Sequence, residues 1–172
     1  MYLHPPGWKG ADSALRVDHT HTVLHHIRII EQAALKIESA ARGYGITGIQ
    51  EFVDRLDAAE EEAVMGTAQL RKLTIDNPLQ QENVHQLATL IEERIAYSNL
   101  LVKTRDEKGL VDVAALSALG RGMHLTDTIH ALSEQMIQLE EDLLSARKES
   151  NDKSIDHLNF FSVRHPGSCF FY

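Results

Sequence analysis

Residues 123–143 read MHLTDTIHALSEQMIQLEEDL, and this stretch decides the fold. Its apolar residues recur at alternating spacings of four and three, which is the heptad pattern of a helix that packs along one side against other helices. The residues expected to face the core are Leu125, Ile129, Leu132, Met136, Leu139 and Leu143. The stretch therefore predicts one long helix of a bundle.

Three earlier stretches carry a similar period. The first, from Thr20 onward, contains Val23, Ile27, Ile30, Ala34, Ile37, Ala41 and Tyr44. The second contains Ile49, Phe52, Leu56, Ala59, Ala63, Leu70 and Leu73. The third contains Val84, Leu87, Ile91, Arg94 or Ile95, Ser98 and Leu101. Four helices of about 27 residues, each about 40 Å long, with short connections predict an all-α, elongated up-down-up-down four-helix bundle.

Capping residues and glycines predict where the first helix begins and ends. Asp12 or Ser13 can cap its start, because a side-chain oxygen there accepts a hydrogen bond from a free backbone N–H. The helix is expected to end near Arg42, because glycines favour the backbone conformations that terminate helices. The glycines in question are Gly43, Gly45 and Gly48.

Two capping boxes predict the starts of the second and third helices. Thr47 and Gln50 have the spacing at which two side chains satisfy each other's backbone donors. For the third helix, Asn77 is the expected cap, Pro78 suits the first helical position, and Gln80 completes a second box.

The remaining boundaries divide the chain into three parts. The third helix is expected to end near Lys108-Gly109, and residues 111–119 predict a short extra helical segment before the glycine-rich break at 120–122. Beyond Ser150 the heptad spacing of apolar residues stops. The prediction is an N-terminal extension over 1–11, the bundle over 12–149 and an irregular tail over 150–172, with both ends of the bundle at the same pole.

Composition and missing motifs exclude several functions. The net charge of −8, without a basic stripe, argues against a nucleic-acid partner. No apolar run approaches the roughly 20 residues that cross a bilayer, and the chain begins without the pattern of a signal peptide. No phosphate loop, nucleophile elbow or Cys-x-x-Cys pair occurs, so we expect no cofactor and no catalytic residues.

Ten histidines raise the possibility of a metal site. His21 and His25 are separated by one helical turn and are the weak candidates, although solvated surface histidines are the simpler interpretation. A di-iron site would need Glu-x-x-His pairs that point into the core. The pair Glu82 and His85 lies beside the predicted core-facing positions, as does the related pair formed by Asp127 and His130. No metal is therefore predicted.

Two arginines fall beside or within the predicted core. Arg42 and Arg94 occur where aliphatic residues would be expected. A charge near a bundle core needs a partner. For Arg42 this is either Glu38, one turn away, or an anionic ligand.

Two groups of residues resemble the signatures of a known family. The first is Glu38-Ser39, Arg42-Gly43-Tyr44, Thr47-Gly48 and Phe52. The second is Leu70, Leu73-Thr74, Asp76-Asn77-Pro78 and Gln80, and His19-Thr20 matches the start of the pattern. Together they resemble the third class of CHASE domains, over about Val17 to Arg147.

The resemblance implies a sensory function. Similar domains lie outside the cytoplasm, between two transmembrane helices of histidine kinases and diguanylate cyclases. It implies a periplasmic input domain without enzyme activity that is paired as a homodimer and responds to an unknown small ligand or stimulus. Contact with the membrane would come only through neighbouring segments absent from this chain. Residues implied or considered for ligand binding or signalling are Arg42, Tyr44, Arg94 and Glu38; those implied as structural are Gly43, Thr47, Gly48, Asp76, Asn77 and Pro78.

The expected mechanism is a shift of the fourth helix relative to the first, with the glycine-rich breaks at 43–48 and 120–122 as the places that yield. Two alternatives stay open at this point. One is a stand-alone helical module that docks a partner protein, and the other is a metal-binding bundle.

Overall fold

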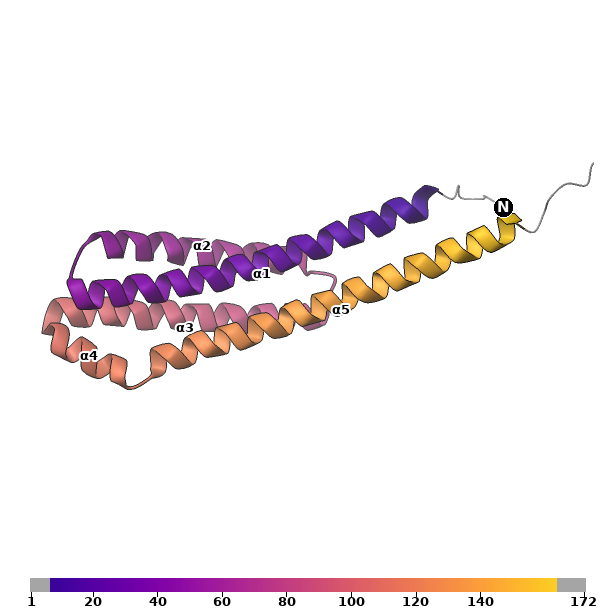
Figure 1. Ribbon diagram of the computed structural model, residues 1–172. Helices are drawn as coiled ribbons and strands as arrows, with labels where there is room; N and C mark the ends of the chain where they lie inside the picture. Colours follow the sequence, from indigo (N-terminus) through magenta and orange to yellow (C-terminus); the bar gives the residue numbers. More distant parts are fainter. Residues whose placement is uncertain (1–6, 164–172) are drawn as a thin grey trace, which may run out of the picture.

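The computed structural model describes residues 7–163 of the 172-residue chain, and side chains over 15–149. These residues form five α-helices (Figure 1). The helices are α1 (Gly7–Thr47), α2 (Glu51–Leu73), α3 (Pro78–Lys108), α4 (Leu110–Ala118) and α5 (Arg121–Val163).

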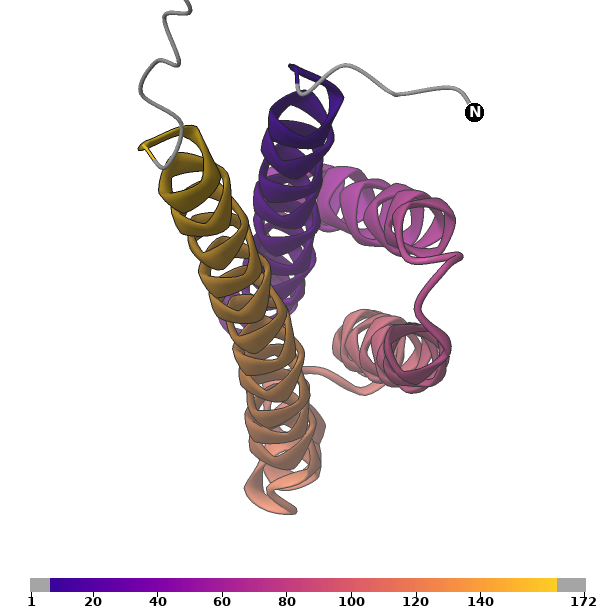
Figure 2. The same cartoon turned by 90° about the vertical axis from the view of Figure 1, so that its right-hand side faces the viewer.

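The four long helices form the predicted elongated bundle, and α4 is the predicted short segment before the last of them. Helix α1 contacts each of the other helices, while α3 also contacts α2, α4 and α5. Figure 2 shows the long helices grouped around a common interior. All seven predicted apolar positions of α1 are buried, as are Leu56, Leu87, Ile91, Ile129 and Met136 from the other three. The heptad prediction of the core is confirmed at these positions, whereas the predicted core residue Ile49 is exposed and Leu139 and Leu143 are only half-buried.

Helix α1 is longer than predicted at both ends. It begins at Gly7 rather than at Asp12 or Ser13, and it continues past Arg42 to Thr47. Gly43 and Gly45 stay helical because their role is close packing: a Cβ on Gly43 would lie 2.4 Å from the ring of Phe52, and one on Gly45 2.9 Å from Val113. Only Gly48, with a φ of +70°, has the left-handed backbone that ends the helix.

The predicted capping box between Thr47 and Gln50 does not form. Helix α2 begins one residue after Gln50, whose own backbone is helical and whose side chain makes no capping bond. The Thr47 hydroxyl instead donates to the carbonyl of Gly43 and accepts from the N–H of Ile49, at 2.7 and 3.2 Å. Thr47 therefore helps to close α1 rather than to open α2.

The start of α3 is as predicted, with one difference. The Asn77 side chain accepts a hydrogen bond from the backbone N–H of Gln80 at 3.2 Å, and Pro78 is the first helical residue. Gln80 does not complete the box, because its side chain is fully buried and reaches α5 instead. At the other end α3 stops at Lys108, where Gly109 has a φ of +88°.

The irregular tail predicted from residue 150 is wrong for its first part, because α5 continues to Val163. Residues 150–163 contain no proline and no glycine, and the next helix-breaking residues are Pro166 and Gly167. The rest of the predicted tail, residues 164–172, lies outside the described residues. The long helices also differ in length, with 41, 23, 31 and 43 residues in chain order, rather than being equal.

The two longest helices project from the same pole of the bundle. The start of α1 and the end of α5 both extend beyond α2 and α3 at this pole, which we call the exit pole (Figure 1). The opposite pole holds the α1–α2 connection, the end of α3, helix α4 and the start of α5, and we call it the α4 pole. The predicted same-pole arrangement is therefore present.

Candidate functional site

A buried arginine marks the α4-pole half of the bundle. Arg94 on α3 is only 1% exposed, although its side chain carries a full charge. Its Nη1 donates to the carbonyl oxygen of Gly122 at 2.8 Å, and its Nε has no hydrogen-bond partner among the described residues. Burial lowers the pKa of the Arg94 guanidinium, because the charged form loses its hydration.

An aromatic ring lies between this arginine and a second one. The Tyr97 ring centroid is 6.0 Å from Arg94 Cζ and 5.9 Å from Arg121 Cζ, distances at which a cation is attracted by the π face. Gly122 makes the arrangement possible, since a Cβ there would lie 2.9 Å from the Tyr97 ring. The first turn of α5 is thus held against α3 by Arg94 and Tyr97.

Glu38 joins α1 to the same turn of α5. One carboxylate oxygen of Glu38 accepts from Arg42 one turn along α1, and the other accepts from the Thr126 hydroxyl on α5. The predicted pairing of Arg42 with Glu38 is present, and the Glu38 carboxylate also raises the pKa of Arg94 against the effect of burial. Glu38 therefore pairs with Arg42, accepts a hydrogen bond from Thr126 and supplies negative charge near Arg94.

These groups border a pocket of about 340 Å³ between α1, α3, α4 and α5. Its wall is mainly apolar, and the Glu38 and Arg42 side chains are its charged elements. The lining residues are Glu38, Ala41, Arg42, Ile46, Tyr97, Leu101, Leu110, Val113, Ala114, Ser117, Gly122 and Met123. A small, largely apolar molecule with one charged or hydrogen-bonding group fits such a lining.

Tyr44 does not line this pocket. Its hydroxyl donates to the Asp106 carboxylate near the end of α3, and this hydrogen bond, with burial and the Asp106 charge, raises the pKa of Tyr44. Of the four predicted ligand or signalling residues, the structure brings Glu38 and Arg42 into the pocket wall. Arg94 lies behind that wall, and Tyr44 ties α1 to α3 separately.

The second signature group lies at the exit pole. Asp76, Asn77 and Pro78 line a smaller pocket of about 220 Å³ together with His19 and Glu140. Arg147 also lines this pocket, and its side chain donates to the Thr20 hydroxyl at 2.8 Å and so connects α5 to α1. The two signatures therefore lie at opposite ends of the bundle, the first with Gly43, Thr47 and Gly48 at the α4 pole and the second with Asn77 at the exit pole.

The two histidines that were weak candidates for a metal site lie at the surface, as the simpler interpretation had it. His21 and His25 are both exposed, and within the described part of the chain no group of three converging metal ligands includes them. One such group does occur, formed by Glu31, His130 and Glu134. The Glu82 and His85 side chains are exposed, as their positions beside the core predicted.

Sequence reasoning missed Tyr97, Thr126 and this three-residue group. Tyr97 lies one position before the predicted core residue Ser98, and no motif marks it. His130 and Glu134 do carry a readable signal, because they stand one helical turn apart on α5. Their third partner comes from α1, 99 positions before His130, and only the fold brings it near.

Comparisons with known proteins agree with this architecture. A family model described as the CHASE3 domain matches residues 13–150. Among solved structures, the chain is similar to the sensor domain of the histidine kinase HK9 from Rhodopseudomonas palustris, with a TM-score of 0.68 and 25% sequence identity. The similarity covers 73% of this chain and 98% of that sensor domain.

No curated protein matches the chain. Among the described residues, no helix combines the length and apolar character needed to cross a membrane. The family match includes all of α2 and α3, most of α1 and α5, and both groups of residues that resembled family signatures. The bundle is thus a sensory input domain, and the chain belongs to the CHASE3 domain family.

Proposed function

We propose that this domain is the extracytoplasmic input module of a membrane-bound receptor and that it transmits its signal through α1 and α5. The observation that carries the proposal is the projection of these two helices from one pole (Figure 1). The residues that line the larger pocket lie toward the other pole. Two helices that leave one pole side by side can each continue into a membrane-spanning segment.

The pocket at the α4 pole has contacts with both transmitting helices. Glu38, Ala41, Arg42 and Ile46 come from α1, and Gly122 and Met123 come from the first turn of α5. A ligand changes a conformational equilibrium only by binding one arrangement better than another. A molecule in this pocket would do so by favouring one position of the α5 start relative to α1.

Polar contacts join α5 to α1 at several places along the two helices. Thr126 donates to Glu38, His130 contacts Glu31, and Arg147 donates to the Thr20 hydroxyl and to the backbone carbonyl of Arg16. Apolar packing also joins the two helices, and such packing permits discrete shifts of one helix along another. We propose the contacts made by Thr126, His130 and Arg147 as the points that differ between the two signalling arrangements.

Bridging α1 to α5 tests this mechanism in the full-length receptor. In a receptor whose Cys169 is replaced by serine, cysteines in place of Glu38 and Thr126, joined by a short bis-maleimide, would fix the two helices where their side chains now touch. We expect the receptor output, measured in cells over a panel of growth conditions, to collapse to one level after bridging. Each single-cysteine variant treated with the same reagent is the control and should keep the normal range.

A bridged receptor that responds over the full range would rule out a shift between α1 and α5. A receptor whose single-cysteine controls also lose their response would instead implicate the Glu38 and Thr126 side chains themselves, through the pocket wall they form. Either result leaves the family assignment unchanged and revises only the mechanism.

A further inference from the structure

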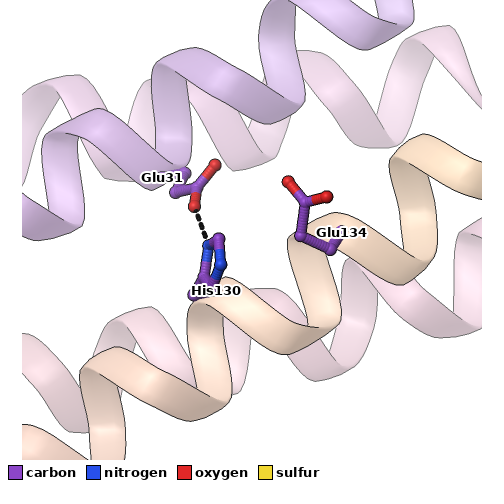
Figure 3. Close-up of side chains that lie close together, drawn as sticks. All are labelled: Glu31, His130 and Glu134. Carbon is purple, nitrogen blue, oxygen red and sulfur yellow. Dashed lines mark hydrogen bonds and ion pairs between the residues drawn. The ribbon is translucent and has the colours of Figure 1, made fainter.

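Three potential metal ligands converge on the outer edge of the α1–α5 contact. Glu31 comes from α1, and His130 and Glu134 come from successive turns of α5 (Figure 3). One ligand atom from each lies within 4.8 Å of the others, and His130 Nδ1 is 2.5 Å from a Glu31 carboxylate oxygen. Figure 3 shows the carboxylates and the imidazole directed toward the space between the two helices.

The donor set has a clear chemical preference. One imidazole nitrogen with two carboxylate oxygens suits a borderline divalent cation such as Zn²⁺, whereas Mg²⁺ and Ca²⁺ favour oxygen ligands alone. Zinc bonds of about 2.0–2.1 Å in a tetrahedron place ligand atoms about 3.4 Å apart. The His130 side chain is 62% exposed and Glu134 is exposed as well, so small rotations of either can reach that spacing.

The local charge favours a cation. Glu31 and Glu134 supply two carboxylates, and Asp127 adds negative charge near the imidazole on the same face of α5. The His130 imidazole opposes this negative charge only when it is protonated. Its hydrogen bond with Glu31 raises the pKa of His130. A divalent ion would neutralise both carboxylates at once, and water would complete its coordination on the exposed side.

We infer that Glu31, His130 and Glu134 form a binding site for a divalent cation of the zinc class, and that the bound ion joins α1 to α5. The inference goes beyond the proposed receptor function and does not depend on it. It concerns the two helices that project from the exit pole, so a bound ion would oppose their relative movement. The exposed pair His21 and His25 provides the comparison, since both of its ligands come from a single helix.

Calorimetric titration of Zn²⁺ into the full chain, after treatment with a chelator, tests the site. We expect one stoichiometric site whose affinity falls by about tenfold or more in each of Glu31→Gln, His130→Ala and Glu134→Gln, because each loses one of three protein ligands. The double variant His21→Ala/His25→Ala is the matched control and should keep the wild-type affinity. Mg²⁺ at the same concentrations should not compete.

Glu31→Gln separates a bridge between helices from binding to α5 alone, because it leaves the pair on α5 intact. Zn²⁺ should raise the thermal midpoint of the wild-type chain and of the His21→Ala/His25→Ala control, but not that of Glu31→Gln. His130 and Glu134 are exposed and Glu31 is half-buried, and circular dichroism verifies that each variant folds. Equal zinc affinity in the wild type and all three ligand variants, or loss of binding only in the His21/His25 variant, would overturn the inference.

Discussion

Replacing Gln80 by alanine is expected to destabilise the bundle by about 3–5 kcal/mol, the largest effect of any single polar substitution considered. Gln80 is fully buried, and its Nε2 donates to the Glu140 carboxylate at 2.8 Å and to the carbonyl of Met136 at 3.1 Å. The alanine would leave a cavity and would also remove a donor from Glu140, which is only 4% exposed. Chemical denaturation measures the change in the free energy of unfolding.

Gln86→Ala is the matched control for this prediction. Gln86 lies on the same helix but is exposed, and its amide donates only to Glu82 one turn away, at 3.1 Å. Its loss should cost less than about 0.5 kcal/mol. The double variant Gln80→Leu/Glu140→Leu should recover part of the stability, because neither partner is then left buried alone. If Gln80→Ala cost no more than Gln86→Ala, the contact between α3 and α5 would not be as described.

The second large effect is expected at Arg94, where two substitutions should differ sharply. Arg94→Ala should lower the free energy of unfolding by about 2–4 kcal/mol, because it leaves a cavity behind Tyr97 and removes the link to Gly122. Arg94→Met should lie within about 1.5 kcal/mol of the wild type. The methionine fills much of the same space, and it removes a charge whose burial is costly.

The comparison of the two Arg94 variants separates a packing role from a role of the charge. Arg71 provides the control, since it is an exposed arginine of α2 whose replacement by alanine should stay within about 0.5 kcal/mol. If Arg94→Met were as unstable as Arg94→Ala, the guanidinium would be required for folding. The expected near-normal stability of Arg94→Met would instead favour retention of the charge for signalling at the α4 pole.

The sequence was sufficient to predict most of the core, because the heptad period alone fixes which side of each helix is buried. The predicted positions from Val23 to Tyr44 are buried without exception. The Asn77 cap and the glycine at the end of α3 were also predictable, since local backbone chemistry decides both. These features depend on residues that are neighbours in the sequence.

The glycines show where local reasoning failed. Gly43 and Gly45 resemble helix breakers in the sequence, but their purpose is to let Phe52 and Val113 approach the α1 backbone. Contacts of that kind depend on the tertiary fold, and they override the local preference of glycine. Gln80 is a similar case, because a buried partner on α5 replaces the capping role that its spacing suggested.

The candidate site was predicted only in part for the same reason. Glu38 and Arg42 stand one turn apart on α1, so their pairing could be read from spacing. Thr126 contacts Glu38 from another helix, and Tyr97 and Gly122 line the same pocket. No pattern in the sequence predicts those contacts. The group formed by Glu31, His130 and Glu134 likewise requires the register of α5 against α1.

The central claim is that α1 and α5 connect this domain to a membrane-bound receptor, and sequencing the coding DNA on both sides of residues 1–172 tests it most directly. The account predicts an apolar segment of about 20 residues on each side, with a kinase or cyclase output domain after the second. A reading frame that lacks both apolar segments would contradict the receptor assignment. It would favour the alternative of a stand-alone helical module that docks a partner protein.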